Sequence, residues 1–186
     1  MPSPQKAKGS GFEREIAKYL SETYGESFIR APGSGAYIGG KNQNRTQILH
    51  EGQIRSFKGD IVPGESFPKF NAECKFYSDF AFHLLLTGEH KVLDGWIQQL
   101  LDVADPGDCN ILFMKFNRIG RYVAVQCHLT WIIDNFTFYA SKKVGDWYII
   151  EFDHFMAHNK NLLKAYSGNT GTSDTKSSTS LLTIDI

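Results

Sequence analysis

The sequence lacks any apolar run that approaches the roughly 20 residues needed by a membrane-spanning helix. Its start, Met1 to Lys6, also lacks the apolar segment of a secretory signal. Cysteine is scarce: Cys74, Cys109 and Cys127 are odd in number and form no C-x-x-C pair. No zinc clip or redox motif of that type is therefore indicated. We expect a cytoplasmic protein with reduced thiols and no membrane segment.

An excess of charge is also missing, because 20 Lys and Arg residues balance 20 Asp and Glu residues. A net charge of zero argues against binding nucleic acid through bulk basicity. The distribution is uneven, however: residues 1–58 contain nine basic and five acidic residues, and the remainder contains eleven and fifteen. A basic face that meets phosphates, if the chain has one, is expected in the N-terminal part.

Several catalytic and binding motifs are absent. The glycine-rich residues 33–40 contain no G-K-[ST] sequence, so no nucleotide phosphate loop is indicated. No G-x-S-x-G elbow predicts a serine hydrolase. His154 and His158 have a spacing that can bind zinc, but neither a third ligand nor an H-E-x-x-H pattern accompanies them. Surface or half-buried histidines are the favoured interpretation.

The length of 186 residues and the ordinary hydrophobic content of 41% predict a single domain with tails. We expect a flexible arm at residues 1–8, a folded domain at residues 9–166 and a flexible Ser- and Thr-rich tail at residues 167–186. The tail ends in an apolar segment that could dock a protein partner. Simple packing or fraying of this segment is the favoured alternative.

Helical and strand periods alternate along the domain, which predicts an α/β fold with a central mixed β-sheet flanked by helices. The S-x-x-E capping box that begins at Ser10 predicts a helix at residues 11–24. A long loop without periodicity is expected at residues 36–57, and residues 60–62 and 70–76 resemble the strands of a hairpin. The other expected elements are helices at 92–103 and 153–166 and strands at 27–31, 110–116, 121–128, 135–140 and 146–152.

The expected strand at residues 70–76 carries the chemistry. Its period of two places Glu73 and Lys75 on one face, while the Cys74 side chain points into the core and leaves only a backbone carbonyl for a metal. Asp60 can converge with Glu73, since adjacent strands lie about 4.8 Å apart. Carboxylates that hold a divalent cation suit phosphodiester hydrolysis, because the cation neutralises the phosphate and activates water. The Lys75 ammonium would orient that water or stabilise charge on the phosphate.

Glu13 is the expected fourth member of this site. It lies one turn into the first expected helix, at the boundary of the buried face, where it could lean toward the sheet. It has an equally good structural role as the last residue of the capping box, and the two roles compete for one carboxylate. An E-x-K pattern alone is more often a solvated charge pair on a strand. Its combination with Asp60 and Glu13 favours a nuclease site.

The joint order of these motifs resembles the PD-(D/E)xK nuclease superfamily, and more narrowly the archaeal-type Holliday junction resolvases found also in phages. The likeness covers roughly residues 9–116 and is carried by Gly11–Glu15, Arg30–Gly35, Gly59–Val62 and Glu73–Lys75. It implies a restriction-endonuclease-like fold and a homodimer that cuts four-way DNA junctions. It also implies Mg²⁺ as cofactor, for which Mn²⁺ is expected to substitute.

The resemblance assigns roles to individual residues. Glu13, Asp60 and Glu73 match the positions that bind Mg²⁺, and Lys75 matches the residue that assists the attack. The cut would leave a 5′-phosphate and a 3′-hydroxyl.

Contacts with DNA are expected from a second group of residues. By the resemblance, Ser34 contacts DNA near the cut, and either Gln98 or Gln99 matches a family glutamine, without the spacing deciding which. Further candidates for phosphate or DNA contact are Arg14, Arg30, Lys41, Arg45, Arg55 and Lys58.

Two other functions fit the same residues. The first is a restriction-like or exonucleolytic enzyme of the same superfamily that acts on linear DNA. The second is a DNA-binding module that kept the fold without the chemistry.

Overall fold

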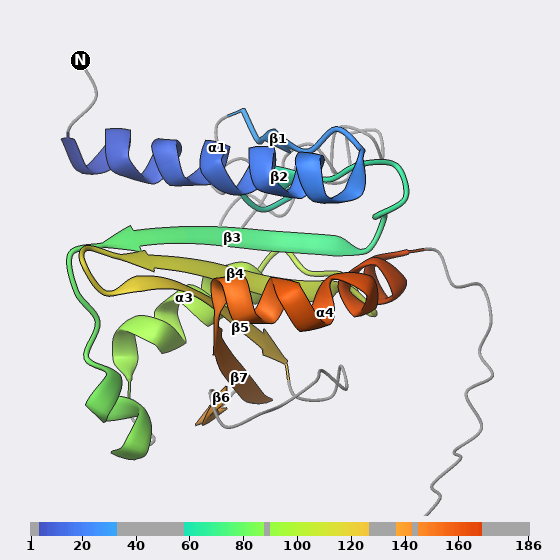
Figure 1. Ribbon diagram of the computed structural model, residues 1–186. Coiled ribbons are helices and arrows are strands. Elements are labelled where there is room, and N and C mark those ends of the chain that lie inside the picture. The colour runs from blue at the N-terminus through green and yellow to red at the C-terminus, as the bar shows by residue number, and fades with distance from the viewer. Residues whose placement is uncertain (1–3, 33–57, 88–89, 127–136, 143–144, 169–186) are drawn as a thin grey trace, which may run out of the picture.

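A computed structural model describes residues 4–32, 58–87, 90–126, 137–142 and 145–168 of the chain (Figure 1). In chain order the elements are α1 (Pro4–Tyr24), β1 (Ile29–Arg30), β2 (Ile61–Val62), β3 (Phe70–Tyr77), the 3-10 helix η2 (Phe82–Thr87), α3 (Lys91–Leu101), β4 (Cys109–Phe116), β5 (Gly120–Gln126), β6 (Thr137–Lys142), β7 (Gly145–Glu151) and α4 (Phe152–Ser167). The α/β class is therefore confirmed.

The main sheet has five strands in the order β3-β4-β5-β7-β6. Strands β3 and β4 are parallel, because η2 and α3 form the crossover between them, and the other neighbours pair antiparallel. The sheet is thus mixed, as the sequence predicts. Strand β3 lies at its edge, so one side of its backbone is available to other parts of the chain.

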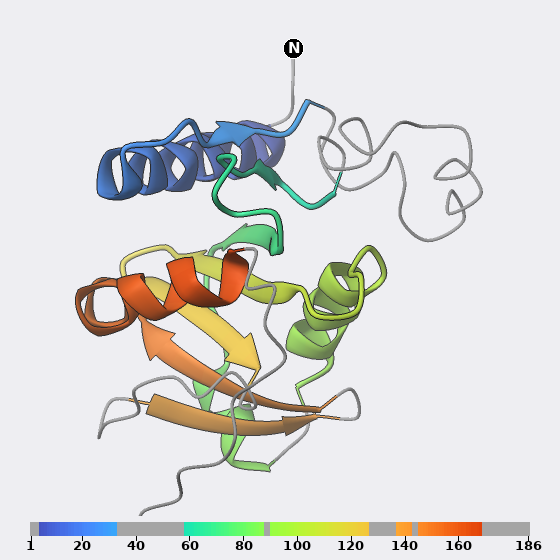
Figure 2. The same cartoon turned by 90° about the vertical axis from the view of Figure 1, so that its right-hand side faces the viewer.

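Two apolar cores cover the two faces of this sheet. In β4, Ile111 and Phe113 pack on the side of α1 and α4, while Leu112 and Met114 pack on the side of α3. Figure 2 shows α3 and α4 on opposite sides of the sheet. This alternation is the strand period of two, and it explains why β4 reads as a continuous apolar run in the sequence.

Strands β1 and β2 form a separate two-stranded antiparallel sheet, with Ile29 opposite Val62 and Arg30 opposite Ile61. The predicted hairpin between residues 60–62 and β3 is therefore wrong. Two extended segments separated by a Pro-Gly turn have the sequence of a hairpin, but β2 finds its ladder partner about 30 residues earlier in the chain.

Helix α1 begins at Pro4, so the flexible arm predicted at residues 1–8 is wrong for residues 4–8. The capping box is wrong as well, because Ser10 lies inside the helix and its hydroxyl donates to the Ala7 carbonyl at 3.2 Å. Lys6, Ala7 and Lys8 are all exposed, so this first part of the helix carries no apolar period that a sequence pattern could detect.

The C-terminal boundary also differs from the prediction. Ser167 is buried at the end of α4, and its carbonyl accepts a hydrogen bond from the Lys69 amide at 2.9 Å. The tail predicted from residue 167 is therefore wrong for Ser167, and residues 169–186 lie outside the described part. The loop predicted at residues 36–57 also lies outside it. Within the described residues, no helix is long and apolar enough to cross a membrane.

Candidate active site

Glu73 and Lys75 project from one face of β3, as its period predicts, and meet Gln99 of α3. The Lys75 ammonium lies 2.6 Å from a Glu73 carboxylate oxygen and donates to the Gln99 side-chain carbonyl at 2.8 Å. The Gln99 amide in turn donates to the same Glu73 oxygen at 2.6 Å. Gln98 bonds instead to Asp102 on the helix surface. Of the two candidates, Gln99 is therefore the glutamine at this site.

Asp60 reaches the same place along the free edge of β3. Its amide donates to the Ala72 carbonyl and its carboxylate accepts from the Cys74 amide, both at 2.8 Å. Gly59 makes this approach possible: its φ is 69°, and a Cβ there would lie 2.4 Å from the Ala72 carbonyl oxygen. Asp60 thus occupies the position that a neighbouring strand would otherwise take.

The Cys74 side chain belongs to the core between the sheet and α1, as predicted. Burial raises the pKa of its thiol well above the ordinary value, and the carboxylates of Asp60 and Glu73 raise it further. Because the N–H and C=O of one residue in a strand point to the same side, the Cys74 carbonyl faces the edge where Asp60 lies. A backbone oxygen is therefore available beside the two carboxylates.

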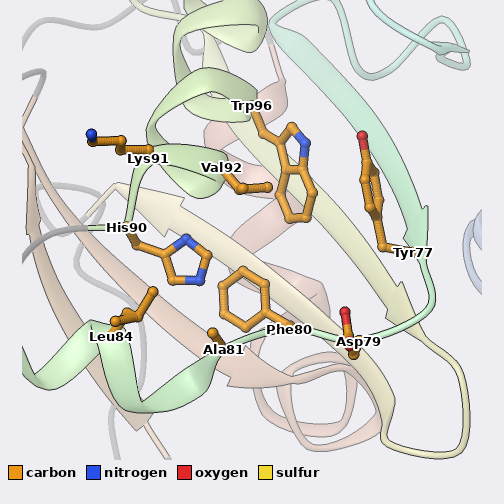
Figure 3. A pocket seen from close by; sticks show the side chains of 9 residues that line it. All are labelled: Tyr77, Asp79, Phe80, Ala81, Leu84, His90, Lys91, Val92 and Trp96. Carbon is orange, nitrogen blue, oxygen red and sulfur yellow. The ribbon is translucent and has the colours of Figure 1, made fainter.

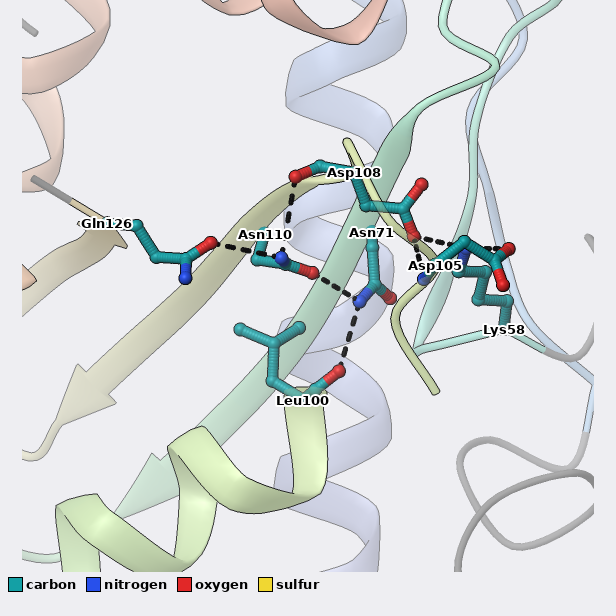
Figure 4. A network of polar contacts seen from close by, with 7 residues as sticks. All are labelled: Lys58, Asn71, Leu100, Asp105, Asp108, Asn110 and Gln126. Atoms are coloured by element: carbon teal, nitrogen blue, oxygen red, sulfur yellow. Dashed lines mark hydrogen bonds and ion pairs between the residues drawn. The ribbon is translucent and has the colours of Figure 1, made fainter. Parts of the chain in front are cut away.

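Lys58 holds the chain just before Asp60. Its ammonium lies 2.7 Å from the Asp105 carboxylate and also contacts the buried carboxylate of Asp108 (Figure 4). Beneath this ion pair, the Asn71 amide donates to the Asn110 side chain at 2.7 Å. Lys58 is buried and neutralised, so the prediction that it contacts DNA is wrong. No local pattern could reveal these partners, because Asp105 lies 47 residues further along the chain.

Glu13 approaches the site from α1. Its carboxylate is buried and accepts a hydrogen bond from the Arg30 guanidinium of β1. This ion pair replaces the capping role that competed for Glu13 in the sequence. Arg30 pairs with Ile61, the residue after Asp60, so the ion pair lies against the chain that carries Asp60.

The three carboxyl groups share one electrostatic environment. Burial and the Glu73 charge raise the pKa of Asp60 to about 7. Burial also raises the pKa of Glu73, against the opposing effect of Lys75, and burial with the charge of Asp60 raises that of Glu13. Three buried carboxyl groups thus lie near two cationic side chains, Lys75 and Arg30, and burial is the largest cause of each raised pKa.

A divalent cation fits this set of donors. Among the described residues, no three His, Cys, Asp or Glu side chains form a ready-made metal cage, and Mg²⁺ is typically held by one or two carboxylates together with water and substrate phosphate. Asp60, Glu73 and the Cys74 carbonyl supply such a partial set. Gln99 is exposed and the Lys75 side chain is 14% exposed, so the surface reaches the site on the α3 side.

The other predicted DNA contacts divide into three groups. Arg14 is exposed on α1, beside Glu13, and remains a candidate. Arg30 is engaged by Glu13. Ser34, Lys41, Arg45 and Arg55 lie outside the described residues.

In a comparison with protein families, a family model described as "Phage putative PDDEXK endonuclease" matches residues 4–165. This region extends from the start of α1 almost to the end of α4 and includes every residue of the site. No curated protein and no solved structure matches the chain.

Proposed function

Because the chain belongs to this family of phage PDDEXK endonucleases, we propose that it is a divalent-metal-dependent DNA endonuclease that cuts branched DNA. A four-way junction is the proposed substrate, and Mg²⁺ is the proposed metal, with Mn²⁺ as a substitute. The enzyme would act as a homodimer, since two symmetric strands of a junction must be cut.

One observation carries the nuclease proposal. Two buried carboxylates from different segments, Asp60 and Glu73, meet at the free edge of β3 with the Lys75 ammonium next to them. Burial raises the pKa of both groups, and the charge of Glu73 raises that of Asp60 further. A divalent cation would stabilise this arrangement, because it replaces a repulsion between the two anions with two attractions.

Each side chain has a role in the proposed reaction. Asp60, Glu73 and the Cys74 carbonyl would hold the cation, which would supply polarisation of the scissile phosphate and a lowered pKa for an attacking water. Lys75 is positioned to stabilise charge on the phosphate or to orient the water. Gln99 fixes the Lys75 ammonium by accepting its hydrogen bond. The cut would release a 3′-hydroxyl and leave a 5′-phosphate.

Glu13 has a different role from the carboxylates of Asp60, which directly precedes β2, and of Glu73 on β3. Its charge is partly neutralised by Arg30, yet it raises the pKa of Glu73. We assign to Glu13 the binding of a metal-coordinated water or a second cation. Its own pKa is raised mainly by burial.

Branched-DNA preference rests on the order of the motifs in the sequence and requires its own test. The purified protein is incubated in Mg²⁺ with three DNA substrates of the same sequence in separate reactions. These substrates are a mobile four-way junction, a linear duplex and a single strand. Paired symmetric nicks in the junction are expected. Cuts within the linear duplex would instead favour a restriction-like enzyme, and progressive shortening from ends an exonuclease.

Variants separate catalysis from binding. Glu73→Gln and Lys75→Ala are expected to abolish cleavage, whereas Lys18→Ala should leave it unchanged, because the Lys18 side chain is 77% exposed on α1. If the unmodified protein binds junctions but cuts no DNA in Mg²⁺ or Mn²⁺, the nuclease proposal is wrong. The chain would then be a DNA-binding module.

A further inference from the structure

An aromatic cavity of about 500 Å³ opens at the C-terminal end of β3, beyond Lys75. Tyr77, Phe80, His90, Val92 and Trp96 are among the residues that line it (Figure 3). Its volume lies within the range of small-molecule sites, roughly 300–1,000 Å³. The sequence pattern did not identify this cavity, because its walls come from the end of β3, the segment after it and the start of α3.

The aromatic rings in this cavity pack against one another. Phe80 stacks on His90 with centroids 4.2 Å apart and on Trp96 at 5.9 Å. Tyr77 lies against Trp96 at 4.7 Å and is 42% exposed, and Val92 is 50% exposed at the mouth. Phe80, His90 and Trp96 are buried and stack on one another, so the exposed Tyr77 ring presents the π-face that a ligand can reach. The lining also contains one acidic and one basic residue, Asp79 and Lys91. It suits a flat, uncharged ring better than a phosphate, because it has little net positive charge.

The cavity is continuous with the candidate active site along two elements. Tyr77 follows Lys75 by two residues on the same face of β3, a distance of roughly 7 Å along the strand. Trp96 precedes Gln99 by one helical turn, about 4.5 Å along α3. Phosphates of one DNA strand are spaced about 3.4 Å along the duplex axis. A nucleotide one or two positions from the cut phosphate can therefore reach the cavity.

Gly95 supports close approach of a ligand at the same place. It is exposed in the middle of α3, where glycine destabilises a helix by about 1 kcal/mol relative to alanine. A Cβ at Gly95 would have no atom of the described chain within 4 Å, so internal packing does not require a glycine. Its bare backbone lies between the cavity residues Lys91 and Val92 and the site residue Gln99.

We propose that this cavity receives an unstacked nucleobase of the DNA strand whose phosphate is held at Glu73 and Lys75. The inference rests on the proposed nuclease function and names a subsite for its substrate. Branched DNA supplies such bases at low cost, because base pairs at a branch point stack poorly and open more readily than those inside a duplex. The aromatic cavity would then favour branched over linear DNA.

The test uses DNA junctions that carry the fluorescent base 2-aminopurine at one position at a time on either side of the cut. Binding is measured in Mg²⁺ with Lys75→Ala protein, in which cleavage is expected to be lost while both carboxylates remain. Stacking on aromatic side chains changes the fluorescence of this base. A change at one position, within two nucleotides of the cut, is expected.

Substitutions at the mouth of the cavity identify the base site. In the same Lys75→Ala protein, Tyr77→Ala is expected to remove the fluorescence change and to weaken binding about tenfold, a typical loss for one base–aromatic stack. Tyr77→Phe should retain both properties. Ile119→Ala is the matched control, because Ile119 is also an exposed apolar residue, at 45%, but is not among the residues that line the cavity.

A second variant avoids any loss of aromatic packing. Gly95→Leu adds a side chain over open surface, so folding should be retained while the approach of DNA to the cavity is obstructed. A fluorescence change that persists in both Tyr77→Ala and Gly95→Leu would overturn the base subsite.

An abasic position provides the complementary measurement. Removing the base whose fluorescence changes should weaken binding to the Lys75→Ala protein about tenfold. It should have little effect on the protein that also carries Tyr77→Ala, because both changes remove the same stack. Equal affinity of the Lys75→Ala protein for intact and abasic junctions would overturn the subsite, even if the unmodified enzyme cuts junctions. Conversely, a base signal with no cleavage by the unmodified enzyme would contradict only the nuclease proposal.

Discussion

At the scale of the residue, the site is defined by carboxylates that lack sufficient positive charge around them. Asp60 and Glu73 are 5% and 2% exposed, so water screens their repulsion poorly. Lys75 neutralises part of this charge from one side only. Metal sites in hydrolases require such an arrangement, and it lowers the stability of the metal-free protein.

The effect of these buried carboxylates on the stability of the metal-free protein can be measured at Asp60. Its folded-state pKa of about 7 lies above the value of 3.8 expected for an unfolded chain, so its protonated form stabilises the fold below pH 4. That contribution is lost as the pH rises from about 4 to about 7. A shift of this size corresponds to at most about 4 kcal/mol.

Asp60→Asn should therefore increase the free energy of unfolding at pH 8 in EDTA and reduce its pH dependence, because an amide keeps the acceptor for the Cys74 amide without the charge. Urea denaturation at pH 5 and pH 8 measures the difference. Addition of Mg²⁺ should stabilise the unmodified protein more than the variant. A variant that is less stable than the unmodified protein at pH 8 would contradict the assigned electrostatics.

Gln99 tests whether the position of the Lys75 ammonium matters. Gln99→Ala removes a hydrogen bond to a charged group, worth roughly 1.5–3 kcal/mol, and is expected to lower kcat tenfold or more with a smaller effect on KM. The adjacent Gln98→Ala is the matched control, since Gln98 bonds only to Asp102 in the described structure. Equal activities of the two variants would exclude the positioning role.

At the scale of the element, the edge strand β3 organises the site. One side of its backbone pairs with β4, and the other side binds Asp60 through Ala72 and Cys74. Its two faces separate the chemistry from the core, with Glu73 toward α3 and Cys74 toward α1. The E-x-K spacing therefore has a geometric basis: residues two apart share a face.

Gly59 allows Asp60 to lie against β3, and Gly25 provides a matched control. Both have positive φ, 69° and 68°, but only at Gly59 would a Cβ collide with the backbone. Gly25→Ala should cost about 1–2 kcal/mol, the penalty for a left-handed alanine. Gly59→Ala should cost more and also weaken metal binding, which thermal unfolding with and without Mn²⁺ would measure. Equal losses in the two variants would show that the contact with Ala72 is unimportant.

The same strand shows what local patterns can and cannot predict. The alternation around Cys74 predicted both faces of β3, because successive side chains of a strand point to opposite faces of the sheet. The capping box at Ser10 and the hairpin at Asp60 were wrong, because each short pattern fits more than one structure. Which structure each pattern forms depends on partners distant in the sequence. Glu13, for example, pairs with Arg30.

At the scale of the whole molecule, the mixed sheet brings together segments that are far apart in the chain. α1, the segment before β2, β3 and α3 each contribute one or two residues to the site, while β4, β5, β7 and α4 help to build the two cores behind it. The apolar periods of these later elements predicted their positions to within a few residues. The anchoring of Lys58 and the aromatic cavity could not be predicted, since both arise only when separate elements pack together.

The central claim is that Asp60 and Glu73 together bind one divalent cation at the edge of β3. The most direct measurement is titration of metal-free protein with Mn²⁺, followed by electron paramagnetic resonance, for the unmodified chain and for Asp60→Asn, Glu73→Gln and Glu65→Gln. We expect binding to the unmodified and Glu65→Gln proteins, and at least tenfold weaker binding to the other two. Equal Mn²⁺ affinity in all four proteins would contradict the claim.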